Sequence, residues 1–205
     1  MRRGTREVHT AHVLLGLFDR PSYLEIGVAT GKTLFSAKAQ RRVGVDPRFR
    51  FDVEMAERQH RNLKLFQLKS DEYFNMLRQD NNREQFNVIF LDGLHTYDQT
   101  YRDLISSLEF LAPGGFIVVD DTVPSDVWST SRDQKKAYDL RKKFGPERSR
   151  NSGSWHGDVF RILPLVALFH DSLDYRTDTF GNGRTVVFRA REWESRDDSE
   201  SISDL

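Results

Sequence analysis

A glycine-punctuated loop near the start of the chain has residue types that could bind a charged ligand. Glu25 ends an apolar run, and Gly27 and Gly31 follow it just before a helical pattern that opens at Lys32. Glycine lets the backbone take turns and close approaches that a Cβ would forbid. The first turn of a helix offers unpaired N–H groups and a partial positive charge to an anionic group. The spacing predicts a ligand-binding turn between a strand and a helix.

Three classes of ligand compete for this loop. A P-loop needs four residues between its first glycine and its Gly-Lys pair, but only residues 28–30 separate Gly27 from Gly31. A dinucleotide fingerprint needs three glycines, and Ala29 occupies the place of the second. The third ligand is S-adenosylmethionine (SAM), whose amino-acid end fits a small-residue turn and whose ribose needs a carboxylate. The loop alone does not decide among them.

Asp46 is the strongest single candidate for a contact to such a ligand. It ends a short strand-like stretch, residues 42–46, roughly 20 residues after the first strand. A carboxylate at the end of the second strand of a βαβ unit is placed to bind ribose hydroxyls. Its alternative role is to start a helix before Pro47.

Alternating strands and helices would bring these residues to one edge of a sheet. Apolar runs predict strands, and helical periodicity fills the segments between them. The predicted parallel strands are residues 23–26, 42–46, 63–68, 86–91 and 116–119, with a turn at 113–115, and the predicted terminal hairpin pairs 173–180 with 184–189. Such an order implies right-handed crossovers and a ligand crevice at the carboxyl ends of the parallel strands.

Composition narrows the classes of partner. The 205 residues suffice for one domain with its own core. The 31 Lys and Arg residues balance the 31 Asp and Glu residues, so net charge gives no reason to expect nucleic acid or an anionic membrane. The absence of cysteine excludes disulfides, thiolate metal ligands and a cysteine nucleophile. Since no signal core or membrane-length apolar run is present, we expect a cytoplasmic protein without a membrane or nucleic-acid partner.

Two later stretches carry a specific resemblance. Residues 88–97 read Val-Ile-Phe-Leu-Asp-Gly-Leu-His-Thr-Tyr, and residues 111–121 read Leu-Ala-Pro-Gly-Gly-Phe-Ile-Val-Val-Asp-Asp. Together with the glycine loop they resemble the methyltransferase-24 branch of class I SAM-dependent methyltransferases, which is related to catechol, macrolide and sugar O-methyltransferases. The resemblance implies an α/β, Rossmann-like methyltransferase fold over residues 1–190. That fold has a mostly parallel seven-stranded sheet with a terminal antiparallel hairpin and helices on both faces.

The resemblance also implies which residues bind the cofactor. The glycine loop would hold the methionine end of SAM, the carboxylate after the second strand the ribose, and the Ser70-Asp71 turn the adenine. Ser70 or Asp71 is also in position to cap the helix that starts there, and the two roles can coexist. Asp92 reaches the same rim from the end of its strand. The expected cofactor-binding set is Glu25, Gly27, Gly31, Asp46, Ser70, Asp71 and Asp92.

A divalent metal follows from the same resemblance. In metal-dependent members, an acidic residue after the fourth strand and an acidic pair after the fifth bind magnesium, and Asp92, Asp120 and Asp121 match these places. Hard cations take oxygen ligands, and Mg²⁺ keeps open positions for substrate oxygens. A hydroxyl beside the metal loses its proton more readily and is held in line with the sulfonium methyl. We therefore expect Mg²⁺ or another divalent metal.

His95 is the candidate general base, with Asp92 as the second catalytic residue. An imidazole can accept a proton near neutral pH. The alternative role of His95 is structural, either ordering Asp92 or capping the helix through Thr96-Tyr97. His156 and Asp158 are outside candidates that could reach the cleft from its far side.

The acceptor is less defined than the cofactor. We expect O-methylation of a small molecule that carries a sugar, polyol or phenolic hydroxyl. Catechol enzymes have an amide at the place of Asp121, while several sugar enzymes have a second aspartate, which favours a sugar or polyol. Residues 124–156 are expected to form a lid or a substrate-side insertion, although their basic run, 132–150, is alternatively a solvated face.

Other possibilities stay open at this stage. One is a P-loop-like nucleotide-binding enzyme with Asp92 or Asp120 as its acid, and another is a SAM-binding scaffold without activity. A homodimer is one candidate assembly. Residues 191–205 are acidic and rich in serine, which predicts a disordered tail.

Overall fold

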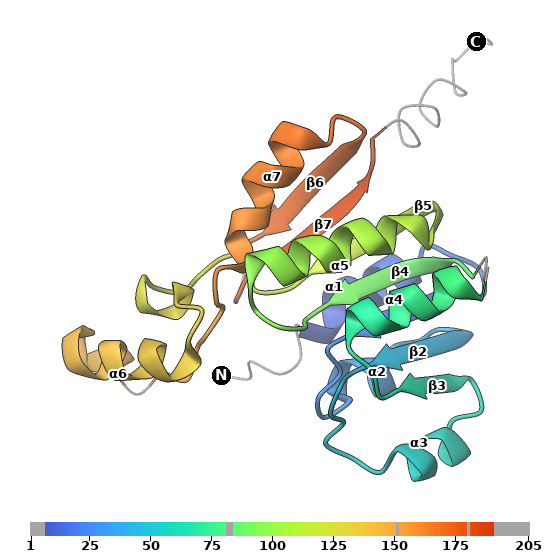
Figure 1. Cartoon of the computed structure of the whole chain (residues 1–205), viewed down its shortest axis with the longest axis horizontal. Helices are drawn as coiled ribbons and strands as arrows, with labels where there is room; N and C mark the ends of the chain where they lie inside the picture. The colour runs from blue at the N-terminus through green and yellow to red at the C-terminus, as the bar shows by residue number, and fades with distance from the viewer. Residues whose placement is uncertain (1–6, 81–83, 151, 180, 191–205) are drawn as a thin grey trace, which may run out of the picture.

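A single mixed sheet organises the chain (Figure 1). The computed structural model describes residues 7–80, 84–150, 152–179 and 181–190. The strands are β1 (Ser22–Ile26), β2 (Arg41–Val45), β3 (Leu63–Phe66), β4 (Phe86–Leu91), β5 (Leu111–Val119), β6 (Leu173–Asp178) and β7 (Arg184–Arg189). The helices are α1 (Glu7–Leu15), α2 (Lys32–Ser36), α3 (Val53–Gln59), α4 (Ser70–Gln79), α5 (Tyr97–Glu109), α6 (Gln134–Phe144) and α7 (Ile162–Phe169). The short 3-10 helices are η1 (Trp128–Thr130), η2 (Glu147–Ser149) and η3 (Val159–Arg161).

The strand order confirms the expected Rossmann-like α/β fold. It runs β3-β2-β1-β4-β5-β7-β6. Strands β1 to β5 pair in parallel, whereas β7 is antiparallel to both β5 and β6 and forms the terminal hairpin. The order reverses between β1 and β4. In open α/β sheets, ligands bind outside the carboxyl ends of the strands at this reversal.

Register at the reversal sets three strand ends level with one another. Ile26, the last residue of β1, pairs with Val45 of β2 on one side and with Leu91 of β4 on the other. The residues that directly follow these three therefore emerge at the same rim. They are Gly27, Asp46 and Asp92.

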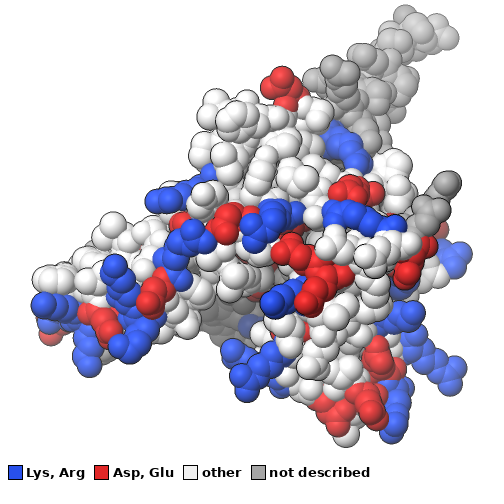
Figure 2. Space-filling model, viewed as in Figure 1, with Lys and Arg blue, Asp and Glu red and all other residues white. Residues whose placement is uncertain are grey.

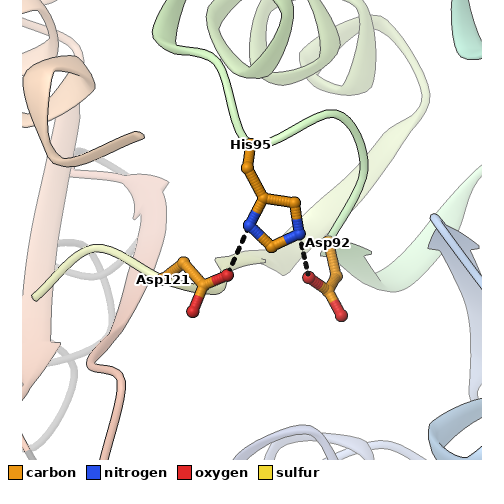
Figure 3. A group of neighbouring side chains, drawn as sticks. All are labelled: Asp92, His95 and Asp121. Carbon is orange, nitrogen blue, oxygen red and sulfur yellow. Dashed lines mark ion pairs between the residues drawn. The ribbon is translucent and has the colours of Figure 1, made fainter. Parts of the chain in front are cut away.

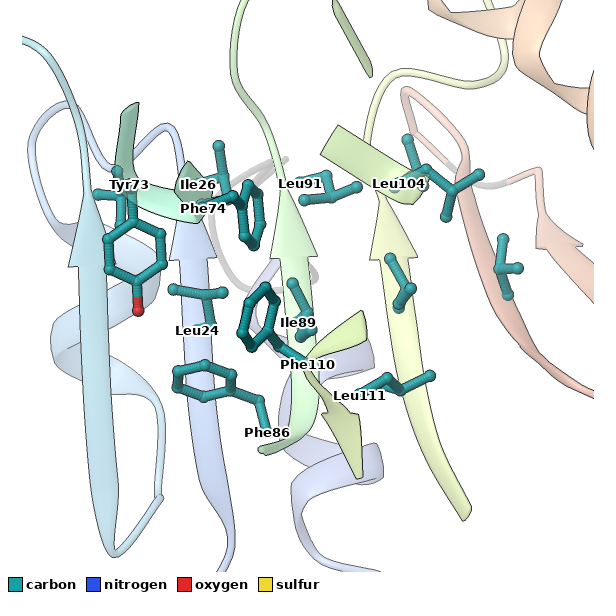
Figure 4. Packing of buried hydrophobic residues seen from close by; sticks show 14 of the residues in the cluster. Leu24, Ile26, Tyr73, Phe74, Phe86, Ile89, Leu91, Leu104, Phe110 and Leu111 are labelled. Carbon is teal, nitrogen blue, oxygen red and sulfur yellow. The ribbon is translucent and has the colours of Figure 1, made fainter. Parts of the chain in front are cut away.

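Apolar side chains cover both faces of the central strands. Leu24 and Ile26 of β1 pack on one face with Phe74 of α4, within the cluster shown in Figure 4. Successive side chains of a strand point to opposite faces of the sheet. Tyr23, next to Leu24 in β1, therefore packs on the other face, with Leu15 of α1. Burial on both faces explains why the parallel strands read as nearly continuous apolar runs. The two layers of helices hold the strand ends in fixed positions.

The predicted turn at residues 113–115 was wrong. These residues lie inside β5, which begins at Leu111. The pairing of β5 with β4 shifts register between Phe86 and Val88, so the chain makes a bulge there instead of reversing. Gly114 has φ 64°, a conformation that glycine adopts without strain, which lets a strand accommodate the irregularity.

A buried arginine anchors the region around α6. Arg141 of α6 is fully buried, and its Nε lies 2.8 Å from Asp126 Oδ2. Its Nη1 donates to the carbonyl of Ser152 at 2.9 Å and its Nη2 to that of Ser154 at 2.7 Å. The lysines of α6 are exposed, and Figure 2 shows basic side chains gathered where this helix projects from the body. The basic run therefore has a solvated face as well as a buried anchor.

Two further expectations concern the membrane and the tail. Within the described ranges, no helix is long and apolar enough to cross a bilayer. The segment 191–205, expected to be a disordered tail, lies outside the described residues.

Candidate active site

A large cavity opens at the rim where β1, β2 and β4 end. Its volume is about 720 Å³. The predicted cofactor-binding residues that line it are Glu25, Gly27, Asp46, Ser70, Asp71 and Asp92. Gly31 is not among the lining residues, although its neighbours Thr30 and Lys32 are. The fold therefore brings nearly the whole predicted set to one hollow.

The glycine loop needs its two glycines for different contacts. Gly27 has φ 87°, and a Cβ added to it would lie 1.9 Å from the carbonyl oxygen of Asp92. Gly31 has φ 77° at the start of α2, and a Cβ there would lie 2.3 Å from the ring of Phe35. Since Gly27 lets β1 and β4 close against each other, it fixes the floor of the cavity. Gly31 instead lets the turn pack against the ring of Phe35, outside the lining of the cavity.

Asp46 ties the glycine loop to the end of β2. Its Oδ2 accepts a hydrogen bond from the Ala29 amide at 2.8 Å, and its Oδ1 accepts one from the Arg48 amide at 2.7 Å. An ionised carboxylate offers about four acceptor positions, so ribose hydroxyls can still be accepted. The alternative that Asp46 starts a helix is wrong, because α3 begins only at Val53 and is capped by Asp52.

Glu25 is buried below the glycine loop. It is 2% exposed, and its Oε2 accepts a hydrogen bond from the Tyr23 hydroxyl at 2.8 Å. Burial, offset in part by that hydrogen bond, raises the pKa of Glu25 to about 8. Glu25 therefore supplies a neutral carboxyl group near neutral pH.

The turn at the start of α4 meets two residues of α5 that the sequence analysis missed. The amide of Gln99 donates to Ser70 Oγ at 3.2 Å, to Asp71 Oδ1 at 3.2 Å and to Asp103 Oδ1 at 2.9 Å. Gln99 and Asp103 both line the large cavity. Their spacing of one helical turn was the available signal, because residues four apart on a helix lie side by side.

The predicted capping role of Ser70 or Asp71 was wrong. The N-cap of α4 is Lys69, and its amide donates to Glu72 Oε2 at 2.9 Å. Ser70 and Asp71 are thus the first residues of the helix, and their side chains accept hydrogen bonds from Gln99. Burial also raises the pKa of Asp103 to about 6, so this polar group changes charge near neutral pH.

Asp92, His95 and Asp121 converge from the ends of β4 and β5 (Figure 3). His95 Nδ1 lies 2.6 Å from Asp121 Oδ2, and His95 Nε2 lies 3.7 Å from Asp92 Oδ1. One ligand atom from each of the three lies within 4.8 Å of the others. A small cavity of about 10 Å³ adjoins them, and Asp120 lines it as well.

The acidic pair after β5 is split between two neighbours. Asp120 Oδ1 lies 3.3 Å from Arg184 Nε on β7, whereas Asp121 faces His95. Asp121 has φ 61°, a left-handed conformation that a non-glycine residue adopts at a cost of about 1–3 kcal/mol. This conformation turns the second carboxylate toward β4. The compact group therefore contains Asp92 and Asp121 with His95, and Asp120 stands at its edge.

The residues at this point fit a divalent cation. Ligands of one ion lie about 2.0–2.6 Å from it, so any two of them are within about 5 Å. The ligand atoms of Asp92, His95 and Asp121 satisfy that limit. The two carboxylates are donors suited to Mg²⁺ or Mn²⁺, and they could hold the ion while the imidazole acts as a base. The small cavity is about the size of one water molecule or ion.

Residues 24–122 match the family model for a methyltransferase domain of the methyltransferase-24 family. This part of the chain is similar to the methyltransferase domain of that family. The match confirms the resemblance drawn from the glycine loop and the two later motifs, and it contains Asp46, Asp92 and Asp121. Comparison of the sequence with curated proteins gave no match.

Solved structures share the fold of this chain at low sequence identity. An O-methyltransferase from Bacillus cereus in complex with S-adenosylhomocysteine (SAH) superimposes with a TM-score of 0.61 and 13% identity, covering 90% of this chain and 81% of that one. The O-methyltransferase TomG from Streptomyces achromogenes, in complex with SAM, gives a TM-score of 0.54 and 16% identity over 89% of this chain and 79% of that one. The MycE methyltransferase of the mycinamycin pathway, in complex with Mg, SAH and mycinamycin VI, gives a TM-score of 0.56 and 14% identity. That match covers 98% of this chain and 51% of the MycE chain.

Proposed function

We propose that this protein is a SAM-dependent O-methyltransferase acting on a hydroxyl group of a small molecule. The observation that carries the proposal is the shared rim. The glycine loop, the Asp46 carboxylate and the Asp92–His95 loop line one cavity of about 720 Å³. The methyltransferase family match and the O-methyltransferases of similar fold support the same reaction.

The cofactor would lie across the three strand ends. The loop that follows Gly27 would hold the methionine end, and Asp46 the ribose. Adenine would lie against the polar cluster of Ser70, Gln99 and Asp103, which line the same cavity. This orientation points the sulfonium methyl toward the end of β4.

His95 would accept the proton of the acceptor hydroxyl. The acceptor oxygen forms a bond to the methyl carbon while the carbon–sulfur bond breaks, leaving SAH, and the hydroxyl proton passes to His95 Nε2. The Asp121 carboxylate, whose Oδ2 lies 2.6 Å from His95 Nδ1, would stabilise the imidazolium that forms when Nε2 takes the proton. A divalent metal held by Asp92 and Asp121 would supply Lewis acidity that lowers the pKa of the hydroxyl.

The acceptor side would be built from residues 124–156, the substrate-side insertion of a domain that spans residues 1–190. Gln134, Gly153 and Trp155 of this region line the large cavity next to Leu94 and His95. Sugar, polyol and phenolic hydroxyls all remain candidates, with the second aspartate at 121 favouring a sugar or polyol. We expect this reaction to need no nucleic-acid or membrane partner and to take place in the cytoplasm.

A methyl-transfer assay tests the proposal. Purified protein is incubated with SAM carrying a labelled methyl group, Mg²⁺ or Mn²⁺, and a panel of sugars, polyols and phenols. The proposal predicts a labelled methoxy product, and loss of turnover on addition of EDTA. Turnover that survives EDTA would remove the metal and keep the methyltransferase. SAH binding without transfer to any acceptor would instead favour a non-catalytic scaffold.

A further inference from the structure

A segment far from the catalytic motifs in sequence is interlocked with them in space. Trp155 stacks on the ring of His95, with ring centroids 4.7 Å apart. Gly157 has φ 59°, and a Cβ there would lie 1.6 Å from the carbonyl oxygen of His95. Asp158 Oδ1 accepts a hydrogen bond from the Tyr97 amide at 2.9 Å, at the start of α5. Residues 155–158 are therefore built against the loop that carries His95.

The remaining residue of this segment, His156, has an unusual environment. It is fully buried. Among the described residues, neither of its ring nitrogens has a hydrogen-bond partner. A buried polar atom without a partner costs about 1–3 kcal/mol, so such atoms in a native protein call for a specific explanation.

A neighbouring carboxylate accounts for one of the two nitrogens, Nε2. His156 Nε2 lies 3.8 Å from Asp121 Oδ1, which is itself buried and has no hydrogen-bond partner in the described part of the chain. His156 Nε2 can donate a hydrogen bond when it carries a proton, and an ionised carboxylate oxygen such as Asp121 Oδ1 can only accept one. A shift of about 1 Å brings them to hydrogen-bond distance. The other oxygen of this carboxylate, Oδ2, already faces His95.

We propose that His156 is a positioning residue, which donates a hydrogen bond from Nε2 to Asp121 and fixes the carboxylate between two imidazoles. With Oδ1 held by His156, Oδ2 stays directed at His95 and the carboxylate keeps one orientation at the metal site. Asp121 needs such support because its own backbone is in the left-handed region, at φ 61°. The inference rests on the proposed function, since it assigns Asp121 to the metal and His95 to the proton.

Metal affinity provides a test that needs no acceptor. Removing a hydrogen-bond partner of a metal ligand lowers metal affinity about 10–100-fold. We expect His156→Leu to weaken Mn²⁺ binding to the SAH complex by this factor, measured by calorimetry, while SAH affinity stays within about twofold. His156→Gln keeps an N–H donor and should recover most of the loss. His156→Met provides a second apolar variant if the leucine variant does not fold.

A matched pair at another histidine controls for loss of an imidazole. His170 follows α7, and its Nε2 lies 2.7 Å from the Tyr101 hydroxyl. It lines neither the large nor the small cavity. We expect His170→Leu and His170→Gln to leave Mn²⁺ affinity unchanged. A folded His156→Leu protein that binds Mn²⁺ as the unaltered protein does would overturn the inference.

Failure of the metal proposal can be told apart from failure of this inference. If the unaltered protein binds SAH but no Mn²⁺, the metal part of the proposed function is wrong. The inference is then decided by the ¹⁵N NMR signals of the His95 ring, assigned with His95→Gln. A changed Nδ1 signal in His156→Leu, restored in His156→Gln, supports it. An unchanged signal contradicts it.

Discussion

The indole of Trp155 lies against the imidazole of His95, with ring centroids 4.7 Å apart and planes inclined by 29°. The indole is fixed from behind, because its Nε1 donates to the carbonyl of Ser131 at 2.6 Å. Both rings line the large cavity. The candidate base therefore has an aromatic wall that comes from outside the matched methyltransferase region.

Replacement of Trp155 should affect the acceptor step more than the cofactor. An aromatic stack is worth about 0.5–1.5 kcal/mol beyond its buried area, so Trp155→Ala should lower kcat/KM for the acceptor by about tenfold. Trp155→Phe keeps a stacking ring and should lose about threefold or less. The measurement is methyl transfer at varied acceptor, with KM for SAM as the control. Equal loss in both variants would show that stacking is irrelevant.

Gly27→Ala should abolish cofactor binding. The added Cβ would lie 1.9 Å from the Asp92 carbonyl oxygen, at a φ of 87° that alanine rarely adopts. Gly153→Ala is the matched control, because Gly153 lines the same cavity and its added Cβ meets no atom within 4 Å. Calorimetry with SAH should show loss of binding by about 100-fold or more in the first variant and little change in the second. Retained SAH affinity in a folded Gly27→Ala protein would contradict the geometry of the loop.

Asp126→Ala should destabilise the region around α6. Arg141 is fully buried, and Asp126 is its carboxylate partner. Leaving a buried charge without its partner costs about 3–5 kcal/mol. The control is Asp139→Ala on the same helix, which removes an exposed pair with Lys135 and should cost about 0.5 kcal/mol or less. Urea unfolding measures both variants, and equal stabilities would contradict the buried role of Arg141.

Glu25 should make stability depend on pH. Its pKa of about 8 in the folded protein lies above its ordinary value of 4.5. The stabilisation by the neutral carboxyl is therefore complete below about pH 4.5 and is lost as pH rises through about 8. Glu25→Gln has no such titration, so the stability of the unaltered protein relative to this variant should fall by on the order of a few kcal/mol between about pH 5 and pH 9. A constant difference between the two across that interval would contradict the buried, neutral state.

Much of the fold could be predicted from the sequence because its signals are local. The strand 86–91 was predicted with its observed bounds, since a buried parallel strand reads as one apolar run. The Pro113 region was misassigned because a Pro-Gly-Gly sequence is equally compatible with a turn and with a bulge. Which of the two forms depends on the register with β4, and that is a non-local property.

In the candidate site, too, some residues could be predicted from local sequence and others depend on contacts between distant parts of the chain. Gly27, Asp46 and Asp92 were predictable because each directly follows a strand, and parallel strands end at one rim. The stacking of Trp155 on His95 and the burial of His156 depend on contacts between segments that lie about 60 residues apart in the sequence. No sequence periodicity predicts such contacts, so His156 was named only as an outside candidate and Trp155 was not predicted. The different partners of Asp120 and Asp121 likewise depend on Arg184, which is far from both in the sequence but lies on the neighbouring strand β7.

Calorimetric titration with SAH and with ATP tests the central claim, that the rim formed by the glycine loop and Asp46 is a SAM site. The account predicts micromolar SAH binding that is weakened by at least tenfold in Asp46→Ala, because a carboxylate bound to ribose hydroxyls contributes about 1.5–3 kcal/mol, and no binding of ATP. Binding of ATP, or SAH binding that Asp46→Ala leaves unchanged, would contradict it.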